Sequence, residues 1–267
     1  MGVRAVILIV TCWLSCAFDS VGAQAVDSLV QEARAAAPMR PRDALDLLHR
    51  AVALDSLDYE ANWRAAVAQV GVIELGGDSL AAWLRDSLYL GAERLARRAI
   101  RIDTARADGF FALGMVLGRV ALTKGKRDRL RYAREIYEVA TRAVRLDPRH
   151  DGAHHILGLW HAEAMRTSGF NRFLARNLLG GKILGEASWA RATEHLETAV
   201  QLDPDRIYHR LDLARIEVDR KQFAAAREQL AAIERLPNRV ARDSIYRLEA
   251  GSVLEKIGRM DPGGRRP

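Results

Sequence analysis

The sequence predicts an all-α fold, a right-handed superhelical array of antiparallel helix pairs. Two observations argue against a β-rich fold. No stretch shows the strict alternation of apolar and polar residues that marks a half-buried strand. The 267 residues also include only 6 Phe, 5 Trp and 6 Tyr, few for strands that favour large flat side chains. The third observation is a short sequence that recurs four times at the end of a helical pattern.

The first element is an export signal, expected over residues 1–25. A positive charge precedes the apolar run 5–17, and Ala-Gln-Ala at 23–25 has the small-x-small pattern that signal peptidase cleaves. The run is too short to cross a bilayer comfortably, since about 20 residues are needed. A lipoprotein acylated at Cys16 and an uncleaved membrane anchor are the alternatives. Cleavage predicts a periplasmic or secreted protein that begins at Val26.

Helix pairs are expected over residues 26–236, which belong to a repeat domain spanning 26–258. The recurring sequence marks the end of each pair and reads AVALDS, AIRIDT, AVRLDP and AVQLDP, at 51–56, 99–104, 143–148 and 199–204. In each, alanine lets two helices approach closely, and the aspartate can cap the helix that follows. Proline fits a turn but not a helix interior. Four or five helix pairs account for this stretch.

The array is expected to close with a capping helix over residues 243–258, followed by a disordered tail over 259–267. One insertion, residues 169–189, is both apolar and basic. It either binds a partner or packs on its neighbours as an extended helix and loop.

The segments after each mark also repeat, with Leu-Gly at 113–114 and 157–158 and Leu-Ala at 213–214. This resembles the tetratricopeptide repeat, whose first helix carries Leu and a small residue and whose second ends in Ala…Leu-Asp-Pro. YEANWR, AHHILGLWHAE, SWARA and IERLPNRVARDS, at 59–64, 153–163, 188–192 and 233–244, are similar to the regulator of microtubule dynamics family and its bacterial relatives. The resemblance implies a solenoid (TPR-like) whose concave groove binds peptides or protein segments. We do not expect the microtubule connection in an exported protein.

Cysteine content and charge narrow the functions further. Cys12 and Cys16 both lie in the expected signal, so the mature chain would have no disulfide and no cysteine nucleophile. The formal net charge of +7 favours anionic polymers, lipid head groups or acidic proteins as partners. The expected compartment argues against nucleic acid.

Histidines concentrate at His150, His154, His155 and His161. Imidazoles at this helical spacing could bind zinc, or they could serve packing and helix-start hydrogen bonds, as the resemblance also implies. No His-Glu-x-x-His or Gly-x-Ser-x-Gly sequence is present, and the residues around 180–182 do not fit a phosphate-binding loop. We expect no metal, no cofactor and no catalysis.

Two basic segments are candidates for contact with an anionic surface. Arg94, Arg97, Arg98 and Arg101 form a stripe on one helix, and residues 124–134 (KGKRDRLRYAR) open another. Solvated outer faces are the alternative.

The predicted groove follows from the Leu-Gly pair, which should face the second helix of its own repeat. Residues three before, one after and five after the small residue should then turn to the groove. This selects Phe111, Met115, Arg119, His155, Leu159, Glu163, Leu211, Arg215 and Asp219, and the first helix of the first complete pair adds Trp63. Aromatic residues and arginine dominate binding hot spots, and arginine can hold a carboxylate, so an extended peptide or protein segment is the expected ligand. Core packing is the alternative for Trp63 and Phe111. The sequence predicts neither the partner's identity nor the oligomeric state.

Overall fold

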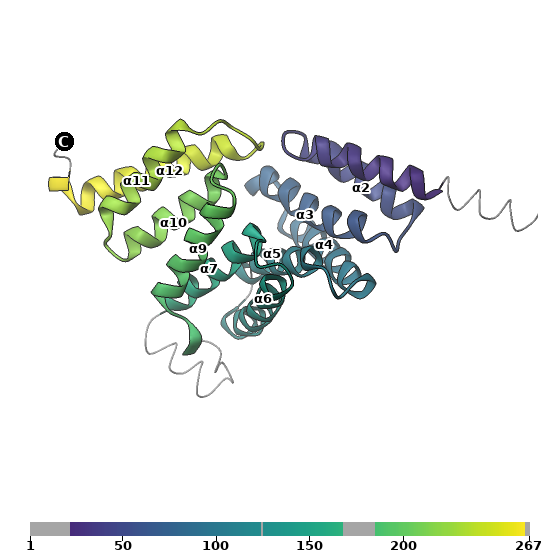
Figure 1. The fold of residues 1–267 in the computed structure, drawn as a ribbon, viewed down its shortest axis with the longest axis horizontal. Helices are drawn as coiled ribbons and strands as arrows, with labels where there is room; N and C mark the ends of the chain where they lie inside the picture. Colours follow the sequence, from purple (N-terminus) through teal and green to yellow (C-terminus); the bar gives the residue numbers. More distant parts are fainter. Residues whose placement is uncertain (1–21, 124, 168–184, 265–267) are drawn as a thin grey trace, which may run out of the picture. The chain divides into compact units, whose positions relative to one another are not determined.

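The structure is a computed structural model that describes residues 22–123, 125–167 and 185–264 (Figure 1). The chain divides into two compact units, Met1–Asp103 and Thr104–Pro267. Every regular element of the described residues is a helix, which confirms the predicted all-α class. None of these helices is both long and apolar enough to span a membrane. Most of the expected signal and of the 169–189 insertion lies outside the described residues.

The part of the first unit that the structure describes contains two helix pairs. Residues 22–36 are helical, followed by α2 (Pro41–Leu54), α3 (Tyr59–Gly76), the short 3₁₀ helix η1 (Gly77–Ser79) and α4 (Ala82–Ile102). Val26, Leu29 and Ala33 of the first helix share a core with alanines and leucines of α2 and α3. Helix α3 packs on both α2 and α4.

Among its described residues, the second unit contains three pairs and one further helix. Its elements are α5 (Ala107–Leu122), α6 (Lys126–Leu146), α7 (Asp151–Arg166), α9 (Trp189–Leu202), α10 (Ile207–Asp219), α11 (Phe223–Arg235), α12 (Asp243–Met260) and η3 (Pro262–Gly264). The pairs are α5 with α6, α7 with α9, and α10 with α11. Each pair stacks on the next through α6 on α7 and α9 on α10, and α12 packs on α10 and α11 (Figure 1).

The second helix of every pair buries three positions, spaced four and then three residues apart. They are Ala44, Leu48 and Ala51; Ala92, Ala96 and Ala99; Ile136, Ala140 and Ala143; Ala192, Leu196 and Ala199; and Ala226, Leu230 and Ile233, all at most 8% exposed. Positions with this spacing share one helix face, so one face of each second helix is in the core. The predicted role of alanine as a close-approach residue is confirmed.

The Leu-Gly pair faces the second helix of its repeat, as predicted. A Cβ at Gly158 would lie 2.7 Å from Cγ of Leu196 and 3.2 Å from the carbonyl oxygen of Ala192, both on α9. A Cβ at Gly114 would lie 3.3 Å from Cγ2 of Val139 on α6. The absence of a side chain at these glycines therefore lets the two helices approach.

The aspartates of the recurring sequence do not cap the following helix, so that prediction is wrong. Asp55 ends α2, and its carboxylate accepts a hydrogen bond from the N–H of Leu57 at 2.8 Å. This is an Asx turn, which shapes the connection between the helices instead. Of the helices that follow the recurring sequence, α3 and α7 are capped by Asp58 and His150, which accept from the N–H groups of Ala61 and Ala153, while α5 and α10 have no side-chain cap.

The carboxyl-terminal end of the chain is more ordered than expected. Helix α12 continues to Met260, and Arg227 of α11 forms an ion pair with Asp261 at 2.8 Å. A tail beginning at residue 259 is therefore not observed as far as residue 264. Residues 265–267 lie outside the described part of the chain.

Candidate functional site

The predicted groove residues lie on the first helices of their pairs. Trp63 is half-buried on α3 of the first unit, with the guanidinium carbon of Arg64 4.2 Å from its ring centroid. Its indole N–H is buried and has no acceptor among the residues that the structure describes. The position of Trp63 fits a partly packed aromatic side chain.

Phe111, Met115 and Arg119 lie on α5 of the second unit, and all three are half-buried. The ring centroid of Phe111 is 4.6 Å from that of His150, and the ring edge occupies the space that a side chain at Gly152 would need. Phe111 therefore wedges between α5 and the start of α7, as the core-packing alternative implies.

The prediction that Leu211 lines the groove is wrong. It is 1% exposed and packs with Ala214, Ala226 and Leu230 between α10 and α11. Residues three apart share a helix face, so a position three before the small residue follows it toward the second helix. His155 has the same offset from Gly158 and is also buried, at 7% exposure.

Glu163 and Asp219 are brought together by an arginine that the sequence analysis did not select. Arg166 of α7 forms an ion pair with Asp219 of α10, with 2.6 Å between Nη2 and Oδ2. Arg166 also pairs with Glu163, one turn earlier on its own helix. Two predicted groove carboxylates thus share one cation across neighbouring first helices.

Arg215 joins α10 to α12 in the same way. Its Nη2 lies 2.7 Å from Oε2 of Glu249, and its Nη1 lies 2.8 Å from Oδ1 of Asp212. We call the set of Glu163, Arg166, Asp212, Arg215, Asp219 and Glu249 the polar seam. It runs across α7, α10 and α12.

A line of four side chains lies between α7 and α10: Asp151, His209, His155 and Asp212. Oδ2 of Asp151 is 2.9 Å from Nε2 of His209, and Nδ1 of His209 is 2.9 Å from Nδ1 of His155. Nε2 of His155 is 3.3 Å from Oδ2 of Asp212. Each imidazole therefore has a carboxylate on one side and the other imidazole on the opposite side.

This line needs three protons to make three hydrogen bonds, because an ionised carboxylate only accepts and two neutral imidazoles supply two N–H groups. Burial alone would raise the pKa of Asp151, but the hydrogen bond and charge of His209 lower it to about 2. Burial would also raise the pKa of Asp212, but the hydrogen bonds and charges of His155 and Arg215 lower it to about 2. Burial and the charge of His155 lower the pKa of His209 to about 4. His209 therefore takes up a second ring proton only in acid.

A second histidine group is formed by His154, His161 and His195. Nε2 of His154 donates to the carbonyl oxygen of Pro148 at 3.1 Å, so in the neutral ring Nδ1 accepts from Nδ1–H of His195 at 3.0 Å. The rings of His161 and His195 stack, with centroids 5.8 Å apart and planes 8° apart. Burial lowers the pKa of both His161 and His195 to about 4.

These contacts fit the packing alternative for the histidines. His150 caps α7, while two pairs of rings meet nitrogen to nitrogen. Within the described ranges, no group of three or more His, Cys, Asp or Glu side chains could hold a metal ion. The absence of metal and catalysis stays a prediction.

Comparison with protein families identifies a family that covers most of this chain. The model of regulator of microtubule dynamics protein 1-3 matches residues 24–258. The chain belongs to this family. No curated protein sequence matches it.

This chain is similar in fold to tetratricopeptide proteins of known structure. TTC0263, a thermophilic TPR protein of Thermus thermophilus, is 20% identical with a TM-score of 0.59, over 88% of this chain and 99% of that one. PilF of Pseudomonas aeruginosa is 17% identical with a TM-score of 0.50, over 91% and 95%. The predicted tetratricopeptide-like fold is therefore confirmed.

The sequence analysis did not identify several residues that contact the predicted groove residues and histidines of this family member. They are Asp151, Arg166, His195, His209, Asp212 and Glu249. His209 lies 54 residues from His155, and His195 lies 41 residues from His154. Contacts at such separations depend on how successive pairs stack, and no spacing within one helix indicates them.

Proposed function

We propose that this chain is a non-catalytic scaffold that binds an extended peptide or protein segment along the first helices of its second unit. The polar seam carries the proposal. It places alternating arginines and carboxylates across three helices, and the side chains of Glu163, Arg166 and Arg215 are 63%, 33% and 37% exposed. The tetratricopeptide fold supports a scaffold in general.

The pairs of the polar seam can exchange partners with a ligand. Partly exposed ion pairs contribute only about 0–1 kcal/mol, so a ligand carboxylate can replace Glu249 on Arg215 at low cost. A guanidinium can hold the new carboxylate through two hydrogen bonds. Met115 and Leu159, half-buried on α5 and α7, add apolar contacts on the neighbouring first helices.

Affinity capture from an envelope extract, followed by calorimetry with the captured partner, tests the proposal. Leu159→Glu and Arg215→Gln should each weaken binding at least about tenfold, or roughly 1.4 kcal/mol. Arg134→Gln is the matched control, because Arg134 is on a second helix and its side chain is 67% exposed. Unchanged binding in both folded variants would reject this surface.

We also propose that the protein is exported. In support, residues 22–25 are exposed and Val26 is the first buried side chain of the described chain. Cleavage after residue 25 would therefore remove no described core contact. Amino-terminal sequencing of the native protein should begin at Val26. A sequence beginning at Met1, or an acylated Cys16, would contradict cleavage there.

A second candidate function is contact with an anionic envelope surface through α4. Trp83 and Leu90 are 74% and 56% exposed. At 3.6 residues per turn they lie within about 40° of Arg94 and Arg101, which are also exposed. An exposed face with Trp, Leu and Arg is typical of helices that lie on membrane surfaces. The basic stripe thus has apolar side chains in line with it.

Co-sedimentation with vesicles tests this second function. The wild type should bind phosphatidylglycerol vesicles and should not bind neutral phosphatidylcholine vesicles. Its binding should weaken with salt and should be lost in the double variant Arg94→Glu/Arg101→Glu. Equal sedimentation of the wild type with both kinds of vesicle would exclude an electrostatic site.

A further inference from the structure

Helix α12 has the sequence features of a first helix, but no second helix of its own lies in the described residues. Leu-Glu-Ala-Gly at 248–251 aligns with Leu-Asp-Leu-Ala at 211–214 of α10. Helix α12 packs on α10 and α11, much as α10 packs on α7 and α9. The position that α11 takes on α10 is left uncovered on α12 by the residues up to 264.

Equivalent positions on α10 and α12 show the effect of this missing cover. Leu211 is 1% exposed, whereas Leu248 is 76% exposed. Ala214 is fully buried, whereas a Cβ at Gly251 would meet no described atom within 4 Å. A capping helix normally has a polar outer face, because nothing packs on it. Helix α12 instead presents a large apolar side chain beside a residue with no side chain.

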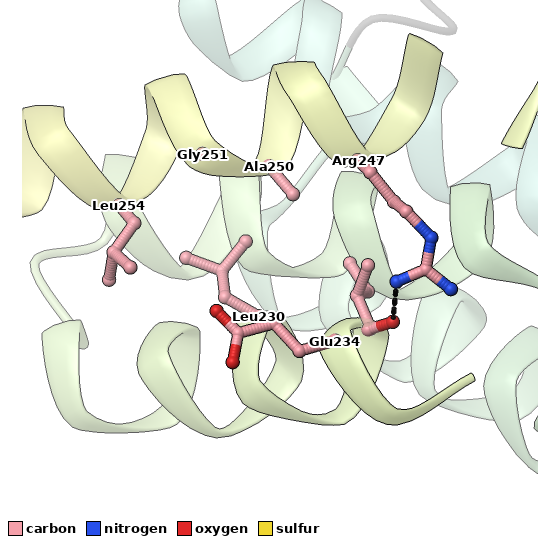
Figure 2. A pocket seen from close by; sticks show the side chains of 7 residues that line it. Leu230, Glu234, Arg247, Ala250, Gly251 and Leu254 are labelled. Carbon is pink, nitrogen blue, oxygen red and sulfur yellow. Dashed lines mark hydrogen bonds between the residues drawn. The ribbon is translucent and has the colours of Figure 1, made fainter. Parts of the chain in front are cut away.

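A hollow of about 220 Å³ lies next to these residues, between α11 and α12 (Figure 2). Leu230, Ile233 and Ala250, all buried, form its apolar lining, while Gly251 and Leu254 are exposed at its edge. Leu254 is 41% exposed. One helix therefore carries both a projecting leucine, Leu248, and the edge of a hollow one turn away.

We propose that this face of α12 is where two copies of the chain associate. A twofold axis requires the same patch on both copies to be complementary to itself. This patch meets that requirement, because Leu248 of each copy can occupy the hollow beside Gly251 of the other. The buried faces of α6, α9 and α11 are already covered by the first helices of their own pairs. The face that a second copy can contribute to the contact is therefore that of α12.

The charges at the rim of the patch also favour a second copy of the chain as the partner. Glu234 and Arg247 both line the hollow, so its rim carries both signs of charge. Two identical rims can therefore place opposite charges together, whereas a rim of one sign would repel its copy. Arg247 donates to the carbonyl oxygen of Ile233 (Figure 2) and also to that of Leu236, and these bonds fix one wall of the hollow.

Sedimentation velocity of the full chain over a range of concentrations, up to about 200 µM, tests the proposal. The wild type should form a concentration-dependent dimer. Leu248→Glu and Gly251→Arg should each raise the dissociation constant at least about tenfold, with melting temperatures close to that of the wild type because both sites are exposed. Leu122→Glu is the control and should leave the dimer intact, since Leu122 is also a largely exposed leucine (62%), on α5.

Three results would overturn the proposal. One is a wild type that stays monomeric over the whole range, and another is a dimer that survives both substitutions on α12. The third is a monomeric chain whose α12 variants lose a different protein partner, since the face would then belong to that partner.

Discussion

At the scale of single residues, the main feature of the second unit is a set of histidines held neutral by burial. His161 and His195 stack face to face, and burial lowers the pKa of each to about 4. An unfolded histidine titrates near 6.5. Between these values the unfolded chain binds more protons than the folded one, so stability must fall as the pH falls.

We therefore predict that the second unit loses stability from about pH 6.5 down to pH 4. His161, which is 1% exposed, should contribute roughly 2 kcal/mol to the loss at pH 5, because one pKa unit corresponds to about 1.4 kcal/mol. Below about pH 4, Asp151 and Asp212 should add to the loss as their lowered pKa values of about 2 are approached.

Urea unfolding at neutral pH and near pH 5 measures this effect. His195→Gln should reduce the difference between the two pH values, while His49→Gln, at an exposed position of α2, should not change it. A urea midpoint that is independent of pH in this range would contradict the burial argument.

Asp212 is predicted to be the carboxylate that matters most for stability. It accepts from His155 and pairs with Arg215, so Asp212→Ala leaves a buried imidazole N–H without its acceptor and leaves Arg215 with Glu249 alone of its two carboxylates. We expect a loss of about 2–3 kcal/mol in the free energy of unfolding. Asp205→Ala is the comparison, because the Asp205 side chain is 53% exposed and should cost less than about 0.5 kcal/mol.

At the scale of helices, periodicity and the recurring sequence predicted the pairs and the direction of the Leu-Gly residues. They did so because both depend on contacts within one pair, which repeat along the chain. The site was predicted less well. Leu211 and His155 were misplaced by an offset that keeps them on the packed face, and Arg166 and Glu249 were missed because they act between pairs. The turn aspartates were misread because Asp55 precedes the cap, Asp58, by a full turn.

The contact of α7 with α9 gives a prediction at this scale. Gly158→Val should destabilise the protein by about 1–3 kcal/mol, since a Cβ there already meets Leu196 at 2.7 Å and a carbonyl oxygen at 3.2 Å. Gly118→Ala is the matched control on α5. No described atom lies within 4 Å of its Cβ, and alanine favours helix, so it should be neutral or stabilising by up to about 1 kcal/mol. Thermal melting of both variants separates close packing from helix propensity.

At the scale of the whole molecule, each of the two units has its own helical core. One core cluster of the first unit comes from the helix over 22–36, α2 and α3, and one of the second comes from α10, α11 and α12. Alanine, leucine and isoleucine make up most of both clusters. Burial of such apolar surface, at about 25 cal/mol per Å², provides stability without any bound ion.

Removal of metal ions should consequently leave the protein folded. We expect the same melting temperature with and without EDTA, measured by circular dichroism on the native protein. A decrease of many degrees in EDTA would show that an ion contributes to folding, and would return the histidines to consideration as ligands.

The packing of helices on their neighbours in sequence also affects how quickly the chain can fold. In the second unit, α5 meets α6 and α10 meets α11, each across one short connection. The entropy lost in closing a loop grows with its length, so contacts between sequence neighbours form first. Proteins dominated by such local contacts fold in microseconds to milliseconds. Each pair can therefore fold soon after it is synthesised, before the later pairs exist, and the stacking of one pair on the next then follows the order of the chain.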